Sequence, residues 1–290
     1  SSQSTFMAAL CSLRVIFRQV SVAIGEKYAY LFKEIENLRI IGMKHLTRIA
    51  LLMSLSGVAM PQQNAREIVQ RADEKNRGKS SRGEMTMIVR RPNWSRSVSM
   101  KSWSMGRDYA LVLITAPAKE KGQVFLKRET EMWQWMPAIG RMIKIPPSMM
   151  MQSWMGSDFT NDDLLKESSI IFDYTHTKLG METIRGYRCH KIELIPLPDA
   201  AVVWGKILLW INEENDNFIQ SQCFDEDGEL VHTQSFYDIK RMGDRSIPTR
   251  MEIIPEGKPG HSTTLLIDAV EYDRPIGEAF FSQQNMQRLR

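Results

Sequence analysis

The residues best suited to acid–base or metal chemistry are the histidines and a short acidic segment. None of the motifs G-x-S-x-G, H-E-x-x-H, G-x-G-x-x-G, C-x-x-C or the P-loop occurs in the sequence. The histidines are far apart, on different predicted strands or turns: His45, His176, His190, His232 and His261. Such scatter disfavours a metal site. Asp158, Asp162 and Asp163 could act as paired catalytic carboxylates. Acidic residues at a helix start also complement the helix dipole, and we favour this second interpretation. The sequence therefore predicts no enzyme, no metal and no cofactor.

Length and charge bound the domain count and the class of partner. The 290 residues allow one large or two small domains, and 43% hydrophobic and 25% charged residues are ordinary for a globular chain. Seven of the 38 Lys and Arg and three of the 34 Asp and Glu lie in residues 1–59, which leaves 31 of each in residues 60–290. This neutral main body argues against nucleic acid as a partner, because phosphate binding needs clustered positive charge.

The first 59 residues differ from the rest of the chain. Residues 43–59 are typical of a signal peptide: Lys44, His45 and Arg48 are followed by an apolar run over 49–55 and by the small residues Gly57 and Ala59. The apolar run is short for a membrane anchor. We predict that residues 1–42 are an upstream extension outside the fold, that residues 60–290 form a single domain, and that the exported protein is periplasmic and begins at Met60.

The cysteines allow two interpretations. Cys11 precedes the predicted signal peptide, and only Cys189 and Cys223 lie in the main body. Two cysteines in an exported domain could form a disulfide. They could equally be buried free thiols.

A methionine-rich segment follows two short predicted strands. Alternation over 132–136 and the residues 141–145 predict the strands, and Pro146 and Pro147 end their pairing because proline has no N–H to donate. Five large apolar residues then crowd a loop: Met149, Met150, Met151, Trp154 and Met155. Since thioether side chains repack around irregular shapes, the loop is either a soft apolar lid or a plug for the core of its own domain.

Strands dominate the rest of the sequence. Further strand-like runs bounded by turn residues are predicted at 84–91, 96–103, 109–115, 123–128, 170–177, 187–195, 204–212, 218–224, 230–240, 247–254 and 263–271. The run at 204–212 is apolar on both faces, which implies that each face is covered. Helices are predicted at 65–75, with Asn64 as its N-cap, and at 159–166. The fold class is therefore mainly β (α+β), with about a dozen strands and two or three helices.

One ordered set of residues resembles the outer membrane lipoprotein-sorting family, the LolA-like group. The matching residues are Trp133, Trp135, Pro137, Gly140, Arg141, Ile145, Met155, Gly156, Ser157, Asp158, Phe159, Asp163 and Leu164. The likeness extends over about 63–281, and G-S-D-F followed by D-L is its most specific part. The resemblance implies a curved antiparallel sheet, a half-open β-barrel of about 11–12 strands, with two or three helices over its concave face. It also implies a periplasmic carrier of a lipid or acylated lipoprotein, with an inner-membrane transporter and an outer-membrane acceptor as partners.

The physics of such a carrier selects candidate lipid-binding residues. An acyl chain in water costs roughly 0.8 kcal/mol per exposed CH₂, so a carrier needs an apolar concavity with adaptable walls. The candidate wall residues are Met85, Met87, Val98, Met100, Trp133, Trp135, Met149, Met150 and Trp154. The alternative function is a non-carrier periplasmic sensor, or an accessory subunit of an inner-membrane export pump. A hydrolase has the least support, because no nucleophile constellation is present.

Overall fold

The computed structural model describes residues 64–161, 163, 169–200 and 202–289, all within one compact unit, Gln62–Arg290. The predicted upstream extension 1–42, the predicted signal peptide 43–59 and most of the helix predicted over 159–166 lie outside the described residues. In the described part, no helix combines the length and the apolar character that crossing a membrane requires.

The described residues form an antiparallel sheet of thirteen strands. The strands are β1 (Ser80–Arg91), β2 (Trp94–Met105), β3 (Tyr109–Ala116), β4 (Val124–Arg128), β5 (Glu131–Met136), β6 (Arg141–Lys144), β7 (Tyr174–Ile184), β8 (Tyr187–Pro196), β9 (Lys206–Asn212), β10 (Phe218–Phe224), β11 (Leu230–Met242), β12 (Arg245–Pro255) and β13 (Ser262–Tyr272). Each predicted run overlaps one strand. The run predicted at 170–177 begins too early, because Ser169–Ile171 forms a 3₁₀ turn before β7.

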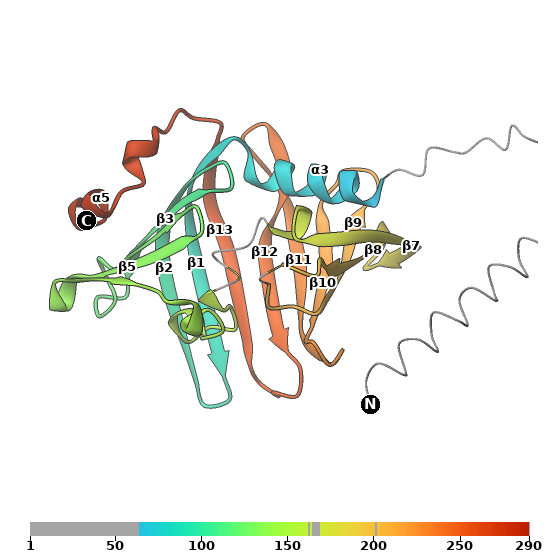
Figure 1. The fold of residues 1–290 in the computed structure, drawn as a ribbon, viewed down its shortest axis with the longest axis horizontal. Helices are drawn as coiled ribbons and strands as arrows, with labels where there is room; N and C mark the ends of the chain where they lie inside the picture. The colour runs from blue at the N-terminus through green and yellow to red at the C-terminus, as the bar shows by residue number, and fades with distance from the viewer. Residues whose placement is uncertain (1–63, 162, 164–168, 201, 290) are drawn as a thin grey trace, which may run out of the picture. The chain divides into compact units, whose positions relative to one another are not determined.

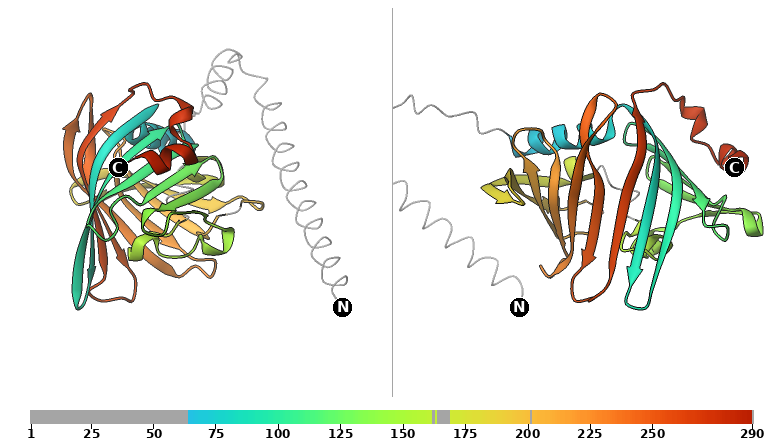
Figure 2. Two further views of the ribbon diagram at one scale, coloured as in Figure 1. Left: turned by 90° about the vertical axis from the view of Figure 1, so that its left-hand side faces the viewer. Right: turned by 180° about the vertical axis from the view of Figure 1, so that it is seen from behind.

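The sheet joins two meanders. Its strand order is β6-β5-β4-β3-β2-β1-β13-β12-β11-β10-β9-β8-β7, so the two halves meet where β1 pairs with β13 and, for example, Met87 lies opposite Leu265. β6 and β7 follow each other in sequence but form the two edges of the sheet. The crossover segment, residues 145–173, connects the two edges, and its described parts are 145–161, 163 and 169–173 (Figure 1). The sheet is curved and remains open (Figure 2), which confirms the predicted fold class with one or two more strands than expected.

Two α-helices flank the described sheet. α3 (Ala65–Arg77) begins at the predicted N-cap, where the Asn64 side chain accepts a hydrogen bond from the Arg66 N–H at 3.1 Å, and it ends at Gly78, whose φ is +68°. α5 (Gln283–Arg288) lies near the C-terminus. The short 3₁₀ segments are η2 (Pro137–Ile139), η3 (Pro147–Met149), η4 (Trp154–Gly156), η5 (Ser169–Ile171) and η6 (Glu278–Phe280). Proline thus ends strand pairing before η3, as predicted.

Apolar side chains fill both faces of the sheet. On the inner face, which α3 and the crossover segment cover, one cluster packs Val69 of α3 against Leu194 and Leu209, and a second packs Trp154 of the crossover segment against Met100. On the outer face of β3 to β5, a third cluster buries Met286 of α5. The helices predicted to cover the concave face therefore include α3, whereas α5 covers the opposite face.

Candidate functional site

A cavity of about 470 Å³ lies on the inner face, with walls from both inner clusters. Met100, Phe125 and Trp154 contribute to one wall, and Leu209 and Cys223 to the other. Strand alternation explains the placement, because on β4 Phe125 points inward while its two neighbours point outward. The volume falls in the range of about 300–1,000 Å³ typical of small-molecule sites.

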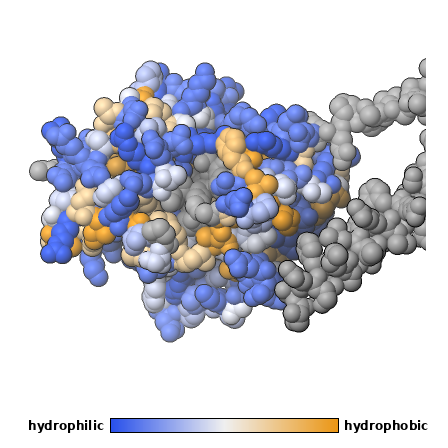
Figure 3. All heavy atoms as spheres, viewed as in Figure 1, coloured by the Kyte–Doolittle hydropathy of each residue, from blue (hydrophilic) through white to orange (hydrophobic). Residues whose placement is uncertain are grey.

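The apolar side chains that line the cavity are buried or half-buried, and Met100, Phe125 and Leu209 are among the buried ones. On the side of the molecule that Figure 3 shows, hydrophilic residues cover most of the surface, and apolar residues form small groups between them. The cavity therefore differs from an exposed apolar patch, which would mark a docking surface.

Trp154 closes the cavity from the crossover segment. Its side chain is 3% exposed, and its ring packs edge-on against Phe125, with centroids 5.3 Å apart at 71°. The indole Nε1 is buried and donates to no acceptor among the described residues. A buried unpaired donor costs about 1–3 kcal/mol. An acceptor on a bound ligand beside Trp154 would offset part of that cost.

An arginine of β1 holds the crossover segment against the sheet. Arg91 Nη1 lies 3.0 Å from Asp158 Oδ2, and Arg91 Nη2 donates to the carbonyl oxygen of Gly156 at 2.9 Å. The hydroxyl of Thr263 donates to the same carboxylate at 2.7 Å. Asp158 therefore anchors the loop through an arginine, which corrects the prediction that it complements a helix dipole.

Asp163 lies at the start of a helical turn, where it and Thr160 form two reciprocal hydrogen bonds. The Thr160 N–H donates to Asp163 Oδ2 at 2.8 Å, and the Asp163 N–H donates to the Thr160 hydroxyl at 3.0 Å. This is the reciprocal pattern of a capping box. The other carboxylate oxygen accepts from Trp204 Nε1 at 3.3 Å, and Asp163 lines the cavity. Asp162 lies outside the described residues.

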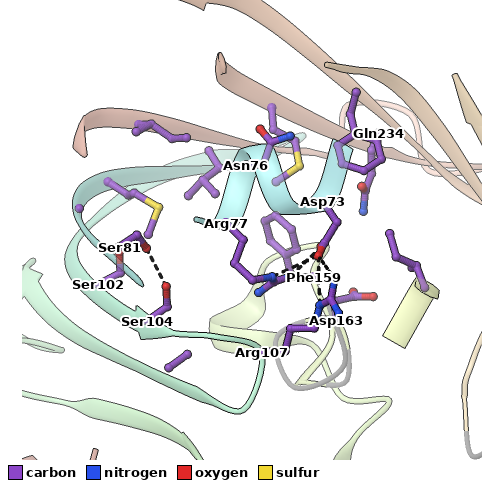
Figure 4. A pocket seen from close by; sticks show the side chains of 18 of the residues that line it. Asp73, Asn76, Arg77, Ser81, Ser102, Ser104, Arg107, Phe159, Asp163 and Gln234 are labelled. Carbon is purple, nitrogen blue, oxygen red and sulfur yellow. Dashed lines mark hydrogen bonds and ion pairs between the residues drawn. The ribbon is translucent and has the colours of Figure 1, made fainter. Parts of the chain in front are cut away.

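The cavity becomes polar where α3 approaches the turn between β2 and β3 (Figure 4). Asp73 of α3 lies between two guanidinium groups, 2.9 Å from Arg77 and 3.0 Å from Arg107. Nearby, the hydroxyls of Ser81 and Ser104 share a hydrogen bond of 2.7 Å. The cavity thus has an apolar part beneath Trp154 and a charged part beside α3.

Burial controls the titratable groups beside the cavity. His232 packs edge-on against Trp204, with ring centroids 5.0 Å apart, and desolvation lowers the pKa of its imidazole. Desolvation likewise raises the pKa of the Cys223 thiol well above its usual value. Among the described residues, no group of three or more His, Cys, Asp or Glu side chains is arranged to hold a metal ion.

The two cysteines of the main body are free thiols on opposite faces of the sheet. Cys223 belongs to the inner cluster beneath α3, whereas Cys189 belongs to an outer cluster with Trp210 and Ile219. Of the two interpretations that the sequence allowed, the structure has the free thiols.

The nine predicted lipid-binding residues lie on both faces of the sheet. Three of them line the cavity: Met85, Met100 and Trp154. Four others belong to or pack on the same inner cluster without lining the cavity: Met87, Val98, Met149 and Met150. The remaining two, Trp133 and Trp135, pack in the outer cluster with α5. Three of the nine predicted residues thus lie in one wall of the cavity, four lie behind that wall, and two lie on the other face of the sheet.

The second wall was missed. It comes from β9 and β10 and includes Ile207, Leu209, Phe218 and Cys223. The signal that could have found it is β9, where Ile207, Leu209 and Ile211 are buried on one face and Trp210 on the other. Such a strand must be covered on both sides.

Comparison with known proteins places the fold. A family model described as "-like: Uncharacterized protein" matches residues 106–288, more than half of the chain. A domain named for outer membrane lipoprotein sorting from Vibrio parahaemolyticus is 23% identical over 77% of this chain and 98% of its own, with a TM-score of 0.69. A DUF1329 family protein from Desulfovibrio piger is 21% identical over 77% of this chain and 98% of its own, with a TM-score of 0.71.

A LolA superfamily protein from Nitrosomonas europaea is 23% identical over 77% of this chain and 99% of its own, with a TM-score of 0.66. No curated protein matches the chain. The chain therefore belongs to the family that the matching model describes, and its fold is the LolA-like fold of outer membrane lipoprotein-sorting domains.

Proposed function

We propose that the protein is a periplasmic carrier that binds the acyl chains of a lipid or lipoprotein and ferries this cargo toward the outer membrane. The observation that carries the proposal is the apolar cavity between the inner face of the sheet, α3 and the crossover segment. An acyl chain inside it leaves water, which contributes roughly 0.8 kcal/mol per buried CH₂.

The side chains around the cavity suit a cargo that must enter and leave. Met85, Met100 and Met132 line it, and Met149 and Met150 pack on the cluster behind. Methionine is unbranched and polarisable, so it adapts to differently shaped apolar groups. These contacts support an adaptable site more than a rigid one.

Export and partners complete the proposal. The predicted signal peptide 43–59 would deliver the mature protein to the periplasm, with Met60 as its first residue. An inner-membrane transporter would load the carrier, and an outer-membrane acceptor would receive the cargo. Mass analysis of protein recovered from the periplasm tests the processing, since retention of residues 1–42 would contradict it.

Binding is tested by native mass spectrometry of the purified protein and by titration with a fluorescent acyl probe. Met85→Trp fills part of the cavity and should weaken probe binding about tenfold or more. The matched control is Met142→Trp, because Met142 is also half-buried but packs on the outer face. Its affinity should stay within about twofold. Absence of both bound lipid and probe uptake in the wild-type protein would refute the carrier function.

A further inference from the structure

Five charged side chains line the cavity among the described residues: Arg77, Arg107, Lys127, Asp73 and Asp163. A cation with unused donors beside a low-dielectric cavity favours a ligand of the opposite charge.

Both carboxylates are already engaged by the protein. Asp73 Oδ1 accepts from Arg77 Nη2 at 2.9 Å, and Asp73 Oδ2 accepts from Arg107 Nη2 at 3.0 Å and Nε at 3.3 Å. Asp163 uses one oxygen for the Thr160 N–H and the other for Trp204 Nε1. Neither carboxylate is therefore placed to bind a cationic ligand without losing these contacts.

Arg107 has N–H groups that donate to no acceptor among the described residues. Its hydrogen bonds within the described part of the chain come from Nε and Nη2 and go to Asp73, which leaves the two N–H groups of Nη1 without a protein acceptor. The side chain is 22% exposed, and its guanidinium lies 5.0 Å from the centroid of the Phe172 ring, which fixes its orientation. A guanidinium with free, oriented N–H groups is suited to a carboxylate or phosphate.

We propose that the cargo is an amphiphile with an anionic head, a carboxylate or a phosphate, which Arg107 binds beside α3. The alkyl chain then lies in the apolar part of the cavity beneath Trp154. This inference rests on the proposed carrier function and adds the chemical class of the head. The polar edge seen in Figure 4 and the apolar walls thus bind the two ends of one molecule.

The test compares two probes of equal chain length, dodecanoate and 1-dodecanol, with inorganic phosphate as a third. Wild-type protein should bind dodecanoate about tenfold more tightly than dodecanol, because a hydrogen bond to a charged group outweighs a neutral one. Arg107→Gln should remove most of this preference and leave dodecanol binding unchanged. The matched control Arg82→Gln should change neither, since Arg82 is exposed and does not line the cavity.

Asp73→Asn should strengthen dodecanoate binding, whereas Arg107→Gln should weaken it. Removing the competing carboxylate releases the Arg107 guanidinium, so dodecanoate should bind several-fold more tightly. If the cluster only holds α3 in place, this variant should weaken both probes. A thermal melt of each variant establishes that it is folded, and Asp73→Asn carries the test if Arg107→Gln does not fold.

The outcomes separate the two proposals. Wild-type protein that binds both dodecyl probes equally overturns the anionic head and leaves the carrier function standing. Protein that binds neither probe overturns the carrier function. Equal weakening of both probes by Arg107→Gln assigns that residue to the structure of the wall. Inorganic phosphate that binds as tightly as dodecanoate assigns the cations to a free anion. Either of these last two results overturns the proposal that the cargo is an amphiphile with an anionic head.

Discussion

Replacing Arg91 with Met should destabilise the protein strongly, because it leaves the buried carboxylate of Asp158 without its charged partner. The side chains of Arg91 and Asp158 are only 12% and 9% exposed, and their closest atoms are 3.0 Å apart. Arg91 also donates to the carbonyl oxygen of Gly156. After the change, the hydroxyl of Thr263 would be the remaining side-chain donor to the carboxylate. Removing one partner of a buried pair costs about 3–5 kcal/mol.

The matched control is the exposed pair of Lys101 and Glu84, whose nitrogen and oxygen are 3.3 Å apart and whose side chains are 43% and 58% exposed. Lys101→Met should cost about 0–1 kcal/mol, because solvent screens that pair. Urea denaturation followed by tryptophan fluorescence gives the free energy of unfolding of both variants. Trp154 lies on the crossover segment and should report its release from the sheet.

A second variant separates two contributions to the loss of stability: the unpaired charge of Asp158 and the lost attachment of the crossover segment. Arg91→Met combined with Asp158→Leu removes both charges, so it should cost clearly less than Arg91→Met alone. A loss below about 1 kcal/mol for Arg91→Met would place the pair among ordinary surface contacts. The claim that it anchors the crossover segment would then fail.

Three further predictions concern groups around the cavity. Burial lowers the pKa of the His232 imidazole in the folded protein. As the pH falls below about 6.5, the unfolded chain therefore binds a proton at this site before the folded protein does, and the folded protein loses stability until the pH reaches the folded pKa. His232→Gln should reduce the fall in Tm between about pH 7.5 and about pH 5. Burial raises the pKa of Cys189 to about 11 and that of Cys223 well above its usual value, so both thiols should label slowly in folded protein, and the unreduced protein should show no mass loss from a disulfide. Met150→Ser should weaken acyl-probe binding yet lower the free energy of unfolding less than Leu209→Ala, which should cost about 2–5 kcal/mol; equal losses of stability with unchanged probe affinity would identify the loop as core.

The local elements follow from the sequence because local rules determine them. Asn64 caps α3 where a side-chain acceptor precedes an apolar helical run, and Gly78 ends it where the backbone requires a positive φ. The strand windows follow from alternation and turn residues, and β10 begins and ends at its predicted residues, Phe218 and Phe224. Such signals depend on neighbours within a few residues, so they need no knowledge of the tertiary fold.

The sequence alone does not show which face of a strand points toward the inner side of the sheet. Trp133 and Trp135 alternate with Met132 on β5, and the sequence predicts correctly that the tryptophans share a face. It does not show which face points inward, because β5 carries large apolar residues on both sides. The structure assigns Met132 to the inner cluster and the tryptophans to the cluster with α5, more than a hundred residues further along the chain. That assignment depends on a contact between distant segments.

The topology also explains why the most specific stretch of the sequence lies in the crossover segment. β6 and β7 are consecutive in sequence but form opposite edges, so the chain between them must connect the two edges, and Trp154 and Phe159 of this connection pack on the inner face. A connection without strand pairing needs its own attachments, and Asp158 with its partner Arg91 provides one. Gly156, with φ of +69°, allows the turn that presents its carbonyl oxygen to the same arginine. The G-S-D-F residues therefore hold the crossover segment against the sheet, and the methionines beside them pack on the inner cluster behind the cavity wall. On this argument, a change at Asp158 should act on the stability of the fold, whereas a change at Met150 should act mainly on binding of the proposed cargo.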